Sequence, residues 1–259
     1  MTYDVLTQAR RRRNRFLAAC LVAAALTGSA VTVVVVLAAG ASRSGTTPDR
    51  AVPPAAAAVA SAAAGVPGNG GDGAGALPTD LTWSDLAGIA LPVSARSGPR
   101  DTGAGLARGF AHDQGGAVLA AVHITARINP QLGPAVFEPT LRTQVVGAGA
   151  TPMREMTAQA YAEMRQQAGV ADGQPLGRLA ATLRGYQVLS YRDDAAVLRL
   201  LIESAGPTGD LLEASTQVQM VWTGTDWALT APGNGRFDEA VSVASPSEVA
   251  AFRPFNPGR

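Results

Sequence analysis

Few side chains in this sequence belong to the types that carry chemistry, and their spacing is the first evidence about function. The chain contains two histidines, His112 and His123, and one cysteine, Cys20. His112 precedes Asp113, and this pair suits either an acid–base dyad or a loop residue before a helix-capping aspartate. The histidines lie far apart, with no cysteine near them, and make a poor set of metal ligands. We interpret His112 as a loop residue and His123 as a helix-face residue.

The other chemical patterns are also incomplete. The sequence contains no serine-nucleophile elbow, and Asp193 and Asp194 stand where a turn is expected in any case. The glycine-rich stretch 103–109 superficially suggests a dinucleotide loop. However, its spacing is wrong by one residue and no acidic residue follows at the distance that a ribose requires, so we interpret it as a loop. The sequence therefore predicts no catalytic, cofactor-binding or metal-binding residue, no cofactor and no enzymatic activity.

The longest apolar stretch, residues 16–39, predicts a transmembrane helix. It holds 24 residues without a charged side chain, and a helix of that length is roughly 36 Å long, enough to cross a bilayer with some tilt. Five arginines among residues 10–15 precede it, whereas only Arg43 and Arg50 follow closely. This bias keeps the N-terminus in the cytoplasm. We expect a basic cytoplasmic tail at 1–15, a single-pass membrane helix at 16–39 and an extracytoplasmic remainder.

Two alternatives concern processing of this anchor. The residues before Cys20 match the box that precedes a lipidated cysteine, but the apolar run follows the cysteine instead of preceding it. Cleavage by signal peptidase is the stronger alternative, because residues 38–41 are small. The apolar run exceeds the usual length of a signal peptide, which favours an uncleaved anchor.

Composition divides the rest of the chain into a linker and one domain. Residues 40–76 are almost entirely Ala, Gly, Pro, Ser and Thr, which predicts a disordered linker. Residues 77–259 form the expected extracytoplasmic domain. That segment holds 14 arginines against 17 carboxylates, or a charge of −3, which argues against direct binding of nucleic acid by the outer domain. With Cys20 in the membrane helix, the domain has no disulfide and relies on its core. The use of arginine without lysine, with abundant Ala and Gly, suggests a high-GC genome such as an actinobacterial one.

Helical periodicity dominates the first half of this domain. Asp113 is a good N-cap for a helix whose apolar residues continue to Ile128. A second helix is expected over 134–146. A third is expected to begin with Thr151 as the cap and to end at Gly169. Its apolar stripe is expected in the core and comprises Met153, Met156, Ala160 and Met164, widened by Tyr161 and Ala168.

After Gly185 the apolar pattern alternates with a period of two, as expected for strands. We predict antiparallel strands at 186–191, near 198–203, at 212–222 and at 227–230, joined by short turns. Residues 81–83 and 89–92 are expected to be extended lead-in segments. Ser245 begins a capping box with Glu248, which predicts a short helix to about Phe252. Helices followed by a meander predict an α+β fold with the helices on one face of a curved sheet.

Several stretches resemble a known class of protein. They are Gly-Phe-Ala-His-Asp with the following small residues at 109–121, Leu-Pro-Val-Ser at 91–94, Gly-Pro at 98–99, and Val-Trp-Thr-Gly-Thr-Asp-Trp at 221–227. They are similar to membrane-anchored actinobacterial proteins of conjugative elements. Those proteins resemble, in anchor and outer domain, the nuclear-transport-factor-like scaffold subunit of type IV secretion and conjugation systems. The resemblance implies a cone-like fold and brings no catalytic residues.

This resemblance implies a scaffold or assembly protein of a conjugative-transfer complex, held in the cell membrane. Its expected partners are the membrane, other proteins of the complex and copies of itself. An accessory protein of an actinobacterial cell-envelope or lipid-import system would share the same anchor and fold. A small-ligand-binding cone domain is a third possibility. Because cone folds can carry acid–base chemistry on tyrosines, Tyr161, Tyr186 and Tyr191 are the remaining candidates for a site-based function.

Overall fold

The computed structural model describes residues 77–206, 210–238 and 240–255, all within one compact unit. The predicted tail (1–15), transmembrane helix (16–39) and linker (40–76) lie outside the described residues. In the part that is described, no helix is long and apolar enough to span a membrane. The elements in chain order are β1 (Leu81–Leu86), β2 (Ile89–Ser94), α2 (Gln114–Arg127), the 3-10 helix η1 (Pro130–Leu132), α3 (Pro134–Thr143), β3 (Val145–Val146), α4 (Ala150–Ala168), β4 (Ala181–Arg192), β5 (Ala195–Ala205), β6 (Leu211–Trp222), β7 (Trp227–Thr230), β8 (Val241–Val243), α5 (Pro246–Val249) and β9 (Arg253–Pro254).

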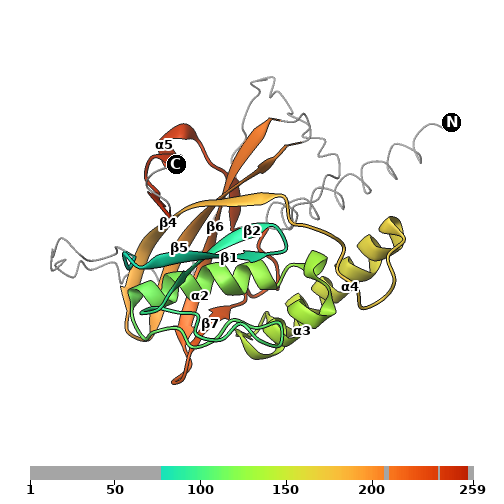
Figure 1. Ribbon diagram of the computed structural model, residues 1–259, viewed down its shortest axis with the longest axis horizontal. Helices are drawn as coiled ribbons and strands as arrows, with labels where there is room; N and C mark the ends of the chain where they lie inside the picture. Colours follow the sequence, from blue (N-terminus) through green and yellow to red (C-terminus); the bar gives the residue numbers. More distant parts are fainter. Residues whose placement is uncertain (1–76, 207–209, 239, 256–259) are drawn as a thin grey trace, which may run out of the picture. The chain divides into compact units, whose positions relative to one another are not determined.

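The expected α+β fold is confirmed, with one large sheet and helices against it (Figure 1). The strand order is β3-β7-β6-β5-β4-β9, and β8 also pairs with β6. The neighbouring pairs among β4, β5, β6 and β7 are antiparallel, as predicted. The prediction of a wholly antiparallel sheet is wrong, because β3 runs parallel to β7. The sheet is therefore mixed.

The alternation along β6 sets which side of the sheet forms the core. Val218 and Met220 are each 1% exposed, whereas Gln217 and Gln219 are exposed. Leu198 on β5 lies directly opposite Val218, so the buried residues of the two strands share one face. Helix α2 packs on this face against β4 to β7 (Figure 1). We call the opposite side, which carries Gln217 and Gln219, the open face.

Helix α2 begins as the sequence predicts but is more deeply buried. Asp113 is its N-cap, and its carboxylate accepts a hydrogen bond from the backbone N–H of Gly116 at 2.7 Å. A Cβ at Gly116 would lie only 2.0 Å from the carbonyl oxygen of Ala111, so this turn requires glycine. Every residue from Gly116 to Arg127 is buried, instead of one apolar face. The many small residues allow the close packing on both sides that this burial needs.

The other two long helices differ from their predictions at the ends. The second helix, α3, ends at Thr143 instead of 146, because the chain then extends to pair β3 with β7. The third helix, α4, begins two residues earlier than predicted, with Gly149 and not Thr151 at the N-cap. Its predicted end is confirmed, because Gly169 adopts the left-handed conformation with φ of 67°.

The methionine stripe of α4 is only partly in the core. Met153 and Tyr161 are buried, and the Tyr161 ring lies 5.6 Å from that of Phe137 on α3. Met156, Ala160 and Met164 are half-buried and Ala168 is exposed, so the expectation of a continuous core stripe is wrong. The helix packs mainly on α3 and η1 at the side of the sheet, where less of its surface can be covered (Figure 1).

Strand pairing is more extensive than predicted in two parts of the domain. The expected lead-in segments form an antiparallel hairpin, β1 with β2. Strand β4 begins at Ala181 instead of 186, and its pairing with β5 shifts register between Leu183 and Gly185. That irregularity hides the period of two in the sequence and explains the late predicted start.

The C-terminal segment 241–255 crosses the open face, and we call it the strap. Its first part, β8, pairs with β6, and its last part, β9, pairs with β4. The capping box of Ser245 and Glu248 is confirmed, but α5 ends at Val249 instead of near Phe252. Gly185 allows the close approach of the strap, since a Cβ there would lie 2.9 Å from the carbonyl oxygen of Arg253.

Candidate functional site

Two motifs that are distant in the sequence meet at one end of the sheet. The Asp226 carboxylate accepts hydrogen bonds from the backbone N–H groups of Gly109 at 2.7 Å and Phe110 at 3.2 Å. The indole N–H of Trp227 donates to the carbonyl oxygen of Ala111 at 2.9 Å. We call this contact between residues 109–113 and 221–227 the motif junction. It attaches the start of α2 to the turn between β6 and β7.

Aromatic rings continue the motif junction toward solvent. The imidazole of His112 stacks on Trp222 with a centroid distance of 4.0 Å and an angle of 9°. Trp227 lies edge-on to Trp222 at 5.6 Å, and Tyr191 lies 6.3 Å from Trp227. Trp227 is 1% exposed, whereas His112 is exposed, so the cluster extends from the core to the surface.

His112 and Asp113 hydrogen-bond to different partners, as the structural interpretation of this pair predicts. The His112 Nε2 atom lies 2.5 Å from the backbone carbonyl oxygen of Asp193, and the Asp113 carboxylate caps α2. Desolvation, followed by the negative charges of Asp193 and Asp113, raises the pKa of the nearby Tyr191 hydroxyl. A raised pKa makes this phenol a weaker acid and leaves less of it deprotonated to act as a base at neutral pH.

His123 is buried in α2 and belongs to a polar pair that the sequence did not reveal. The Nε2–H group donates to the carbonyl oxygen of Pro92 at 2.8 Å, and Nδ1 accepts from Nη1 of Arg127 at 2.9 Å. Desolvation, with the Arg127 charge as the second cause, lowers the pKa of His123 to about 3. Desolvation also lowers the pKa of Arg127 to about 10. At neutral pH a neutral imidazole therefore accepts a hydrogen bond from a charged guanidinium. Their spacing of four residues on one helix is the only sequence signal of this pair.

The remaining tyrosine candidates lie at separate places. The Tyr161 hydroxyl donates to the carbonyl oxygen of Gln174 at 2.9 Å, and the buried Tyr186 accepts from the backbone N–H of Leu77 at 3.2 Å. The structure thus does not bring Tyr161, Tyr186 and Tyr191 into one site. Across the described residues, no group of three or more His, Cys, Asp or Glu side chains is arranged to hold a metal ion.

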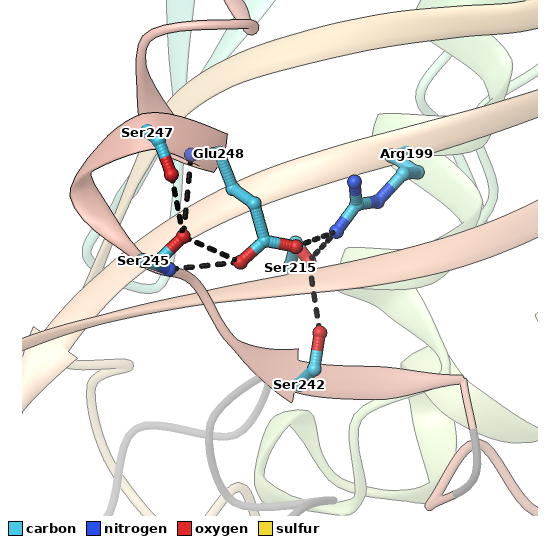
Figure 2. A network of polar contacts seen from close by, with 6 residues as sticks. All are labelled: Arg199, Ser215, Ser242, Ser245, Ser247 and Glu248. Carbon is cyan, nitrogen blue, oxygen red and sulfur yellow. Dashed lines mark hydrogen bonds and ion pairs between the residues drawn. The ribbon is translucent and has the colours of Figure 1, made fainter.

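A polar network fastens the strap to the open face (Figure 2). Nη2 of Arg199 on β5 donates to Oγ of Ser215 at 2.7 Å and to Oε1 of Glu248 at 3.3 Å. The guanidinium also lies over the ring of Phe252, 5.3 Å from its centroid. The N–H of Ser245, followed by the Ser245 hydroxyl and Arg199, lowers the pKa of the Glu248 carboxyl. The network joins the strap to both β5 and β6.

Two hollows lie on the open face, and the strap contributes to both. One, of about 870 Å³, is polar and lies along β6 and the segment after β7; its lining includes Gln217, Gln219, Asn234 and Arg236. The other, of about 660 Å³, is more apolar and lies beside β4; its lining includes Trp83, Leu201, Glu213 and Phe252. We call them the polar groove and the β4-edge hollow. Neither hollow could be predicted from the sequence, because each draws its lining from strands and strap segments far apart in the chain.

The geometry defines an α+β domain that has a helix-covered face and an open face with two hollows. Residues 44–251 match the model of a family described as "Domain of unknown function (DUF8175)", and the chain belongs to this family. Comparison with curated proteins gave no match, and comparison with solved structures gave none either.

Proposed function

We propose that this protein is a single-pass, membrane-anchored scaffold of a conjugative-transfer or type IV secretion-like complex, whose outer domain binds protein partners. The anchor part of the proposal rests on the sequence: five arginines followed by 24 uncharged residues. The complex that it serves is proposed from the resemblance of residues 109–121 and 221–227. The finer fold assignment, a nuclear-transport-factor-like cone, belongs to the same proposal and is supported by helices on one face of a long-stranded sheet.

The observation that supports the binding role is the difference between the packed interior of the domain and its open face. The groups best suited to chemistry have structural partners: His123 bonds to Pro92 and Arg127, and Asp226 bonds to two backbone N–H groups. The open face instead presents exposed amide side chains and two hollows to its surroundings. Such a surface is suited to recognition. Anchoring in a plane also raises the local concentration of the domains, so that weak interfaces suffice.

A small-ligand-binding role is the second candidate, and the hollows favour it. Their volumes lie within the range that ligand pockets occupy, roughly 300–1,000 Å³. Both hollows are open to solvent along one side of the sheet and are not enclosed within the helix-facing core. An open surface of this kind fits a protein partner better than a ligand that must be surrounded.

Crosslinking in cells tests the scaffold proposal. Cys20, the chain's one cysteine, is first replaced by serine, and a single cysteine is then placed at Gln219 on the open face or at Glu138 on α3. We expect Gln219→Cys to give adducts with proteins of the membrane complex, and the matched Glu138→Cys chain to give few. Deletion of residues 16–39 should abolish the adducts. Equal adducts from both positions, or adducts that persist without the anchor, would contradict the proposal.

Topology has a separate test. Protease added to intact protoplasts should digest the domain after residue 76 and leave a small membrane fragment. A protected domain would place it on the cytoplasmic side. A domain found free in the medium would show that cleavage near residues 38–41 occurs instead.

A further inference from the structure

One edge of the large sheet lacks a complete strand partner. On its inner side β4 pairs with β5 from Ala181 to Arg192, but on its outer side β9 covers only Gly185 and Tyr186. Within the described residues, the outer edge from Ala181 to Leu183 therefore pairs with no other strand. An edge of this kind presents unpaired N–H and C=O groups to any extended chain that approaches.

The β4-edge hollow runs along this same edge. Ala181, Thr182, Leu183, Arg184 and Gly185 all line it, although successive side chains of a strand point to opposite faces. A hollow that touches every residue in turn lies against the strand's edge and not only against one face. The hollow has a volume of about 660 Å³; part of it adjoins this edge, and the rest extends over the open face toward Leu201 of β5 and Glu213 of β6.

Apolar side chains form much of the rest of the lining. Leu201 of β5 is buried there, and Val249 and Phe252 reach the hollow from the strap. Trp83 of β1 also lines it and is 40% exposed, one of the few large apolar side chains left at the surface. Covering these groups would remove apolar area from water, which is favourable.

A charged cluster adjoins the hollow: Arg184 and Glu213 line it, and Glu203 lies within reach of Arg184. Nε of Arg184 lies 3.7 Å from a carboxylate oxygen of Glu203 and 3.9 Å from one of Glu213. The two glutamates occupy directly opposite positions on β5 and β6, an arrangement that like charges disfavour. One guanidinium shared by two carboxylates leaves a net charge of −1. The cluster therefore favours a cation placed beside Glu213, its carboxylate in the hollow.

We propose that the outer edge of β4 binds an extended segment of a partner protein by strand addition, with an apolar side chain in the β4-edge hollow and a lysine or arginine directed at Glu213. This inference rests on the proposed role in binding proteins and names the surface that it uses. Strand addition gives affinity through main-chain hydrogen bonds and specificity through pockets for alternate side chains. A small apolar molecule would fill the hollow but leave the backbone groups of residues 181–183 without strand partners.

The first test selects the partner chemistry without assuming a sequence. Random 12-residue peptides displayed on phage are selected against the full chain in detergent micelles. We expect enrichment of peptides in which apolar residues alternate with others and at least one residue is basic. When the Glu213→Gln variant is the target, the selected peptides should keep the preference for apolar residues and lose the preference for a basic one. The matched control Glu138→Gln, which removes an exposed carboxylate on α3, should change neither.

The second test locates the bound peptide and uses the strongest binder of the selection. Amide exchange at residues 181–183 should slow on binding, because their outward N–H groups gain partners. Two N-methylated forms of the peptide, blocked at odd or at even positions, should differ: one binds and the other does not, since only alternate residues bond across one edge. The affinity of the unmodified peptide should fall about threefold to fivefold for Glu213→Gln, as expected for a partly exposed ion pair.

Three results would overturn the inference: selected peptides without a basic preference, unchanged exchange at 181–183, or equal binding of the two N-methylated forms. Each of them leaves the scaffold proposal standing, because crosslinks from Gln219 to complex members do not depend on the β4 edge. Conversely, a cell that shows no anchor-dependent crosslinks would refute the scaffold while the purified chain still bound its peptide.

Discussion

Acidification should destabilise the domain through His123, and the size of the effect follows from the structure. The imidazole is fully buried and neutral, and its pKa is lowered to about 3 from an unfolded value of 6.5. Between these two values the unfolded chain binds a proton that the folded chain excludes. Stability is therefore complete above about pH 6.5 and falls as the pH drops toward about 3.

The slope in that window is about 1.4 kcal/mol per pH unit for one group. Allowing for partial titration near the unfolded pKa, the free energy of unfolding should fall by about 2 kcal/mol between pH 7 and pH 5. Free carboxyl groups titrate mainly below this range. Hydrogen bonding lowers the pKa values of Asp80, Asp101 and Glu248 further, so their contributions also lie at lower pH.

Urea denaturation at a series of pH values provides the assay. The chain's three tryptophans all lie among the described residues, so their fluorescence reports on this domain. His123→Gln keeps an amide that can donate to Pro92 and accept from Arg127 but cannot titrate, and it should remove most of the slope. His112→Asn, which removes the chain's other and exposed histidine, should retain the parent's slope. A 2 kcal/mol loss that persists in His123→Gln would refute this account of the buried imidazole.

Three further substitutions test the packing. Val218→Asp places an unpaired charge in the core and should unfold the domain, whereas Gln217→Asp on the open face should stay within about 0.5 kcal/mol of the parent; equal losses of melting temperature would show that the register is wrong. Asp226→Ala leaves the N–H groups of Gly109 and Phe110 without their acceptor and should cost about 1–3 kcal/mol, with altered tryptophan fluorescence; an unchanged melting temperature would show that the motif junction contributes nothing to stability.

The parts of the fold that the sequence predicts are those with local causes. The N-cap at Asp113, the left-handed end at Gly169 and the alternation along β6 each depend on a few neighbouring residues, and each is present. The four central strands and the capping box at Ser245 belong to the same group. In these places propensity, periodicity and tertiary packing favour the same structure.

The parts that could not be predicted depend on contacts between distant segments. Residues 145–146 continue an apolar helical pattern, but the edge of β7 offers hydrogen bonds that a further turn of α3 cannot match. The local sequence of the strap predicts its path only weakly, because that path is set by contacts with distant residues. These are the contact of Phe252 with Arg199 and the pairing of β9 with β4. His123 is similar: nothing in its neighbours indicates that Pro92 supplies an acceptor inside the core.

The residues of the motif junction stabilise the fold, and they are different residues from those of the proposed binding surface. Two of the stretches on which the proposed resemblance rests, 109–121 and 221–227, meet at Asp226 and Trp227, and their contacts fix the first turn of α2 to the turn after β6. Helix α2 in turn fixes the helix-facing side of the sheet. Those residues therefore specify the scaffold of the domain, and substitutions in them should act on binding only through stability. The β4 edge and the hollow beside it are built from other residues, so they can vary in specificity while the junction stays the same. A domain built in this way can keep one fold and present different recognition surfaces on its open face.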